Sequence, residues 1–107
     1  MNIDISDLKF DEQGLIPVIA QDAATKKVLM LGYANLETLK ESMETKKMVF
    51  YSRSRNARWL KGETSGNFLH IESLSKDCDS DAVLAQVHPA GPTCHTGAMS
   101  CFGDLSD

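Results

Sequence analysis

The 107-residue sequence lacks the features that define several protein classes. No apolar run approaches the roughly 18 residues of a membrane-spanning helix, and residues 1–11 carry three aspartates where a signal peptide would be basic and then apolar. Only 3 prolines and 7 glycines are present, and 42% of residues are hydrophobic, which excludes collagen-like and disordered chains. A net charge of −4 disfavours nucleic-acid binding. We therefore expect a cytoplasmic protein with no membrane or nucleic-acid partner.

The chain has only three cysteines, too few for a disulfide-rich scaffold. Cys78, Cys94 and Cys101 all fall in the last 30 residues, and an odd number of cysteines argues against a disulfide framework. In the reducing cytoplasm this leaves metal binding, catalysis or simple burial. The sequence shows no repeat or linker, and its length predicts one domain over residues 1–107 that buries roughly two thirds of its unfolded surface.

The apolar patterning predicts an α+β fold, mainly an antiparallel or mixed β sheet with one principal helix. Asn35 is placed to cap a helix that runs to about Lys47. Pro17 lacks a backbone donor, so we expect its strand to lie at a sheet edge or to begin irregularly. Glycine and proline after His88 predict a loop that carries the last two cysteines. The predicted strands are 15–22 and 28–34, which form a hairpin, then 48–52, 68–75 and 82–88.

The segment DCDSD at 77–81 places three carboxylates at a spacing of two residues. In an extended chain Asp77, Asp79 and Asp81 would project to one side and Cys78 to the other. Three carboxylates on one face repel, and a hard cation such as Mg²⁺ or Ca²⁺ would relieve that repulsion with oxygen ligands. The alternative is a solvated acidic turn.

The three cysteines predict a zinc site assembled from separate segments. They provide one ligand fewer than a closed structural site, whereas a catalytic zinc keeps one position for water. His95 could supply a fourth ligand, but binding next to Cys94 is geometrically awkward, so we favour a role as acid or base. Three small buried side chains remain the alternative.

All three arginines of the chain, Arg53, Arg55 and Arg58, fall within six residues. Guanidinium groups match phosphate oxygens, so the cluster predicts a phosphorylated small ligand, unless it is only a solvated loop. Trp59 can stack on a base or pack in the core. The small residues Thr64, Ser65, Gly66 and Asn67 follow, in a loop whose amides could approach an anion.

These motifs, in this order, resemble the phosphoribosyl-AMP cyclohydrolase family of histidine biosynthesis. The resemblance covers nearly the whole chain and is expected to be to the stand-alone form, without a fused pyrophosphohydrolase domain. The matching segments are SRSR at 52–55, WLKGETSGN at 59–67, DCDSD at 77–81, CHTG at 94–97 and SCF at 100–102.

The resemblance implies hydrolytic opening of the N1–C6 bond in the adenine ring of 1-(5-phosphoribosyl)-AMP, a phosphorylated purine nucleotide. It implies an interlocked homodimer with zinc shared between chains, Cys78 coming from one and Cys94 and Cys101 from the other. His95 would be the general base. Mg²⁺ would bind Asp77, Asp79 and Asp81. The implied substrate contacts are Arg53, Arg55, Arg58, Trp59, Thr64, Ser65, Gly66 and Asn67.

Two other functions remain open. A nucleoside or nucleotide deaminase also uses zinc to direct water to a ring carbon, and His70 and Glu72 form its H-x-E pair, although no C-x-x-C follows. A zinc-stabilised module that binds phosphorylated ligands would explain the cysteines without turnover. Four protein ligands on the metal would favour the module, and a water ligand would favour an enzyme.

Overall fold

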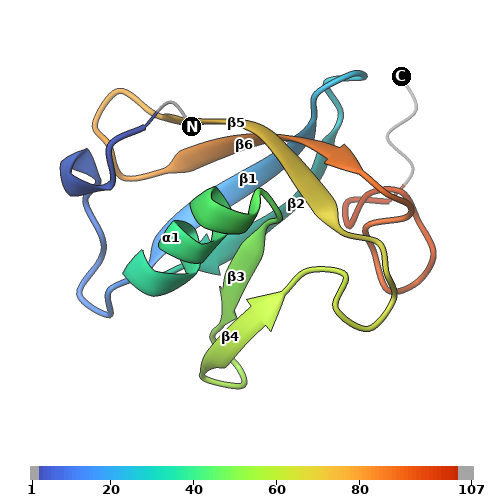
Figure 1. Ribbon diagram of the computed structural model, residues 1–107, viewed down its shortest axis with the longest axis horizontal. Coiled ribbons are helices and arrows are strands. Elements are labelled where there is room, and N and C mark those ends of the chain that lie inside the picture. Colours follow the sequence, from blue (N-terminus) through green and yellow to red (C-terminus); the bar gives the residue numbers. More distant parts are fainter. Residues whose placement is uncertain (1–2, 104–107) are drawn as a thin grey trace.

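Two sheets and one helix make up the fold in the computed structural model, which describes residues 3–103 (Figure 1). The four-stranded sheet has the order β2-β1-β6-β5, and the smaller sheet pairs β3 with β4. Strand β1 pairs antiparallel with β2 and parallel with β6, so the larger sheet is mixed. The predicted α+β class is confirmed. In chain order the elements are the short 3-10 helix η1 (Ile5–Asp7), β1 (Ile16–Asp22), β2 (Val28–Ala34), the α-helix α1 (Leu36–Thr45), β3 (Val49–Ser52), β4 (Ala57–Leu60), β5 (Leu69–Lys76) and β6 (Val83–Pro89).

The helix begins where the sequence predicts. The Asn35 side chain accepts a hydrogen bond from the Thr38 N–H at 2.8 Å, and the Thr38 hydroxyl accepts one from the Asn35 N–H at 3.0 Å. This reciprocal capping satisfies two N–H groups at the start of the helix. Lys46 ends α1 in the left-handed region, with φ at 62°. The predicted hairpin of β1 and β2 is also confirmed.

Strand β4 is absent from the sequence prediction. It pairs antiparallel with β3, from Val49 opposite Leu60 to Ser52 opposite Ala57. Its first two residues are exposed and its last two are half-buried, so no alternation of apolar and polar residues marks it.

The expectation of an edge position for Pro17 is wrong, because β1 lies in the middle of its sheet. Parallel pairing with β6 begins one residue later, at Val18 opposite Val83. The missing N–H of Pro17 therefore falls outside that ladder, which is how a central strand tolerates this proline.

The core lies between the larger sheet and the layer formed by α1 and β3 (Figure 1). Phe50 on β3 is buried against β2, where a Cβ at Gly32 would lie 2.6 Å from its ring. Ser42 of α1 is also buried, and its hydroxyl accepts a hydrogen bond from the Val49 N–H at 2.8 Å. These contacts fix α1 and β3 to each other and to the sheet.

The β5–β6 hairpin separates the two cysteine-bearing segments. Lys76 pairs with Val83 at one end, beside the turn at 77–82, and Leu69 pairs with Pro89 at the other, beside the loop at 90–103. In Figure 1 these segments lie on opposite sides of the molecule. Within residues 3–103, none of the helices has the length and apolar character needed to cross a membrane.

Candidate active site and metal centres

The acidic segment after β5 is a turn, which corrects the expectation of an extended chain. The Ser80 N–H donates to the Asp77 carbonyl at 3.1 Å, and Ser80 has a φ of 65°. The turn still brings the three predicted carboxylates together: one oxygen from each of Asp77, Asp79 and Asp81 lies within 4.8 Å of the others. The Asp77 carboxylate also accepts from the Asp81 N–H at 3.0 Å, which holds the turn in shape.

The electrostatics of this turn suit a cation. Hydrogen bonding with Asp79 and then with Asp77, together with the charges of both, raises the pKa of Asp81 to about 6. The cluster thus holds a proton more tightly than a lone carboxylate does, because positive charge relieves the repulsion. A donor set of carboxylate oxygens alone fits a hard divalent cation such as Mg²⁺.

Two of the three cysteines come together in the loop after β6. The Cys94 N–H donates to the Ala98 carbonyl at 3.1 Å, and the Cys101 N–H donates to the Leu29 carbonyl of β2 at 2.7 Å. A hydrogen bond from the Thr96 hydroxyl, 3.2 Å from the Cys94 sulfur, lowers the pKa of Cys94. Partial burial and the charge of Cys94 raise the pKa of Cys101. The two thiols are thus close enough to affect each other's ionisation.

Cys78 does not join them within one chain. In the described part of the chain, the acidic trio is the only group of three or more metal-binding side chains with ligand atoms this close. The eight residues of β5 span roughly 23 Å, and Cys78 lies beyond one end while the loop of Cys94 and Cys101 lies beyond the other. A single chain in this fold therefore presents two thiols at one place and the third far away.

A pocket of about 400 Å³ adjoins Cys94. Two segments that are distant in sequence form it: the end of β4 with the loop that follows it, and the loop that follows β6. Five predicted site residues outside the metal-ligand set line it: Trp59, Thr64, Ser65, Asn67 and His95. A histidine, a thiol and an aromatic face thus border one space large enough for a heterocyclic ring.

Lys61 is a pocket residue that the sequence analysis did not single out. Its Nζ donates to the Thr93 carbonyl and lies 5.1 Å from the centroid of the Trp59 ring. The side chain therefore joins β4 to the cysteine loop. Lys61 follows Trp59 and Leu60 directly within a motif segment, and this position could have indicated a role in the site. A lysine at such a position is equally consistent with an exposed, solvated side chain.

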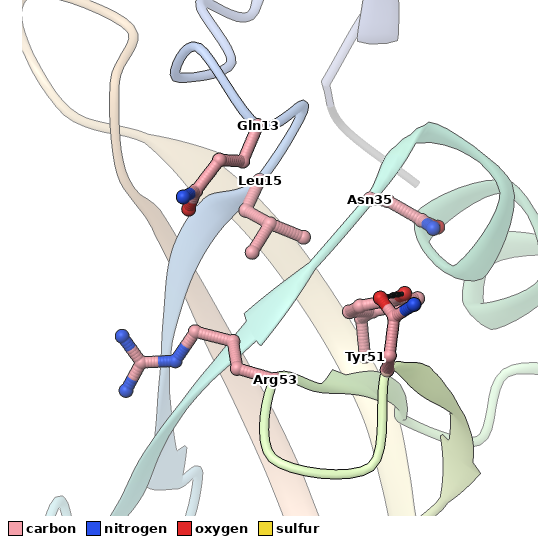
Figure 2. A pocket seen from close by; sticks show the side chains of 6 residues that line it. Gln13, Leu15, Asn35, Tyr51 and Arg53 are labelled. Carbon is pink, nitrogen blue, oxygen red and sulfur yellow. Dashed lines mark hydrogen bonds between the residues drawn. The ribbon is translucent and has the colours of Figure 1, made fainter.

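The three arginines do not meet at this pocket. Arg58 forms a two-point ion pair with Glu41 of α1, including a 2.6 Å bond from its Nε, and this hydrogen bonding lowers the pKa of Glu41. Arg55 lies exposed in the β3–β4 turn. Arg53 stacks on the Tyr33 ring at 3.9 Å from its centroid and lines a different pocket, of about 510 Å³ (Figure 2). Neighbours in sequence thus diverge in space.

The loop after β4 depends on one glycine. Gly62 has a φ of +92°, and a Cβ there would lie 2.5 Å from the backbone nitrogen of Phe68. Gly66 has a φ of +81° with nothing within 4 Å. We expect Gly62→Ala to lower the free energy of unfolding by about 3 kcal/mol or more and Gly66→Ala by about 1 kcal/mol, because only the first adds a backbone clash. Urea unfolding of both variants tests this, and equal losses would contradict it.

The chain is similar in sequence to known proteins of histidine biosynthesis. The family model described as phosphoribosyl-AMP cyclohydrolase matches residues 30–103. The chain is 56% identical over 96 residues to the histidine biosynthesis bifunctional protein HisIE of Bacillus subtilis, covering 90% of this chain and 46% of that protein. The HisIE proteins of Caldanaerobacter subterraneus and Escherichia coli are 57% and 54% identical, over 94% and 87% of this chain and 49% and 46% of theirs. The chain spans about half the length of these relatives.

Proposed function

Because this chain belongs to the phosphoribosyl-AMP cyclohydrolase family, we propose that it hydrolyses the N1–C6 bond of the adenine ring in 1-(5-phosphoribosyl)-AMP. The product is the phosphoribosyl-formimino-aminoimidazole carboxamide ribotide, in histidine biosynthesis. One observation supports this most directly. The pocket that holds Trp59 and His95 also borders Cys94, so a ring binding site, a titratable imidazole and a metal-binding thiol share one space.

The proposed metal at this pocket is zinc, held by Cys78, Cys94 and Cys101. Thiolate donors suit zinc, and the interaction between Cys94 and Cys101 supports a common ligand set. Zinc bound there would supply Lewis-acid activation of a water molecule. Three protein ligands leave a position for that water, as in catalytic zinc sites.

The proposed site is shared by two copies of the chain. Cys78 lies at the opposite end of the β5–β6 hairpin from the other two cysteines, so it completes a site only with the loop of a second subunit. Twofold symmetry makes such sharing reciprocal and yields two equivalent sites in each homodimer. The acidic turn, which contains Cys78, would then lie beside the partner's pocket, and its carboxylates would hold Mg²⁺ where substrate phosphates can also reach it.

His95 is proposed to take a proton from the attacking water as a bond forms between that oxygen and C6. The carbon becomes tetrahedral, and the bond from C6 to N1 then breaks as N1 takes up a proton. His95 lines the pocket beside Cys94, which is where such a base is needed. Trp59 offers a face for the purine ring, and the loop residues Thr64 to Asn67 offer polar groups along its edge.

The test of this function is incubation of zinc-loaded protein with phosphoribosyl-AMP while the absorbance change of ring opening and the release of ammonia are followed. Ring opening without ammonia is the expected result. Ammonia release would identify a deaminase, and binding without any reaction would identify a binding module. Either result would overturn the proposal.

We expect about one tightly bound zinc per chain and loss of activity on chelation, because the cysteines are reduced and no other ligand set of this softness is present in residues 3–103. Metal analysis of purified protein measures the first, and recovery on adding Zn²⁺ but not Mg²⁺ checks the second. Active protein without zinc would contradict the assignment.

A further inference from the structure

Arg53 is held in place without being neutralised. Its guanidinium lies 3.9 Å from the centroid of the Tyr33 ring, a stacked arrangement that leaves its N–H edges free. In the described part of the chain, no carboxylate pairs with Arg53 and its side chain makes no hydrogen bond. Arg58 differs in both respects, since its Nε and Nη2 donate to the two carboxylate oxygens of Glu41. Arg53 is therefore an oriented cation that has no anionic partner among residues 3–103.

The Gln13 side chain also lines the pocket around Arg53, and its amide makes no hydrogen bond within residues 3–103. Figure 2 shows the guanidinium of Arg53 and the amide of Gln13 projecting to the same side of Leu15. Among the other lining groups, the Asn35 Oδ1 accepts a hydrogen bond in the cap of α1, and the Tyr51 hydroxyl donates to the Asn56 Oδ1. A guanidinium and a side-chain amide that line one pocket can both donate hydrogen bonds to the oxygens of a single phosphate group.

This pocket connects to the acidic turn and not to the pocket of His95. A neighbouring depression of about 480 Å³ is lined by Asp81, Tyr33 and Leu15 among others. Leu15 also lines the Arg53 pocket, and Tyr33 carries the Arg53 guanidinium on its ring. The Arg53 pocket and the His95 pocket have no lining residue in common. Arg53 thus lies on a surface that continues to Asp81 of the acidic turn, the turn to which Cys78 belongs.

We propose that Arg53, assisted by Gln13, binds a phosphate group of the substrate, and that it does so from the subunit that supplies Cys78 rather than from the subunit that supplies His95. This proposal rests on the proposed function and adds which arginine acts, on which subunit. The chemistry is consistent: a cation on the acidic turn takes phosphate oxygens as ligands, and a guanidinium on the same surface can bind others.

A binding measurement tests the first half. The His95→Ala protein serves as a background in which substrate is consumed slowly, and calorimetry measures its affinity for phosphoribosyl-AMP with and without Arg53→Gln. We expect Arg53→Gln to weaken binding about tenfold or more, because it removes a charge-assisted contact. Lys40→Gln removes the same charge from an exposed position on α1 and should leave the affinity unchanged. Equal affinities for all three proteins would overturn the proposal.

Mixed dimers test the second half, assayed at low substrate concentration, where weak binding limits the rate. Arg53→Gln chains refolded with His95→Ala chains should regain activity, since one of the two sites then has both residues intact. Arg53→Gln chains refolded with Cys78→Ala chains should not regain activity, because each site retains one of the lesions. The reverse pattern would show that Arg53 acts on the His95 subunit and would overturn the proposal.

Two controls distinguish a wrong subunit assignment for Arg53 from a wrong proposed function. Refolding His95→Ala with Cys78→Ala chains recovers activity if the site is shared, whatever Arg53 does. Wild-type protein that does not open the ring refutes the proposed function itself. Only with both controls positive does the Arg53 pattern decide the subunit assignment.

Discussion

Refolding equal amounts of Cys78→Ala and Cys101→Ala chains together is expected to restore about a quarter of wild-type activity, although each variant alone is inactive. Random pairing makes about half of the dimers mixed. One site of a mixed dimer carries both lesions, and the other combines intact Cys78 from one chain with intact Cys94 and Cys101 from the other. Independent sites then give roughly half of one half.

The matched control is a mixture of Cys94→Ala and Cys101→Ala chains. Both lesions lie on the same loop, so every site in every dimer lacks a thiol and no activity should return. Native mass spectrometry establishes that mixed dimers have formed in both experiments. If the mixture of Cys78→Ala and Cys101→Ala chains contained mixed dimers but remained inactive, the shared site would be rejected.

Replacing His95 with alanine is expected to lower turnover by about 10² to 10⁴ while leaving the fold and the zinc content unchanged, because a positioned base typically contributes that much. His95 is exposed in the loop and makes no contact with the hydrophobic core, so its removal leaves no cavity. Steady-state kinetics and metal analysis of the same preparation provide both measurements.

His88→Ala provides the comparison. His88 is also exposed, and its Nε2 lies 3.0 Å from the Glu72 carboxylate across the β5–β6 hairpin, outside the pocket. An exposed pair of this kind contributes little to stability, so this variant should retain wild-type turnover. If His95→Ala instead lost its zinc, His95 would be a ligand and the base would have to be found elsewhere.

Local signals account for what the sequence predicts well. Short runs rich in apolar and β-branched residues mark β1, β5 and β6, and a capping residue followed by helical spacing marks α1. Strand β4 escapes prediction because it is stabilised mainly by pairing with β3, a contact that no local pattern encodes.

Some features of the candidate site are also predictable from local sequence, whereas others depend on the tertiary structure. The convergence of the acidic trio is predictable from its spacing, but the turn that achieves it depends on Ser80 adopting a positive φ, which is uncommon for serine. The separation of Cys78 from Cys94 follows from the length of the β5–β6 hairpin and therefore needs the topology. The divergence of Arg53 and Arg58 depends on partners from other elements, Tyr33 and Glu41, that no spacing reveals.

The parallel pairing of β1 with β6 has a kinetic consequence. Val18 pairs with Val83, so closing this contact requires a long loop of chain, and such contacts form late and slowly. During synthesis β1 can pair with β2 at once, but its other edge stays open until β6 emerges. The acidic turn and the cysteine loop flank β6, so both acquire their final positions in this last step. Metal uptake therefore reports on completion of the sheet, and a refolding chain should bind zinc no faster than β6 docks.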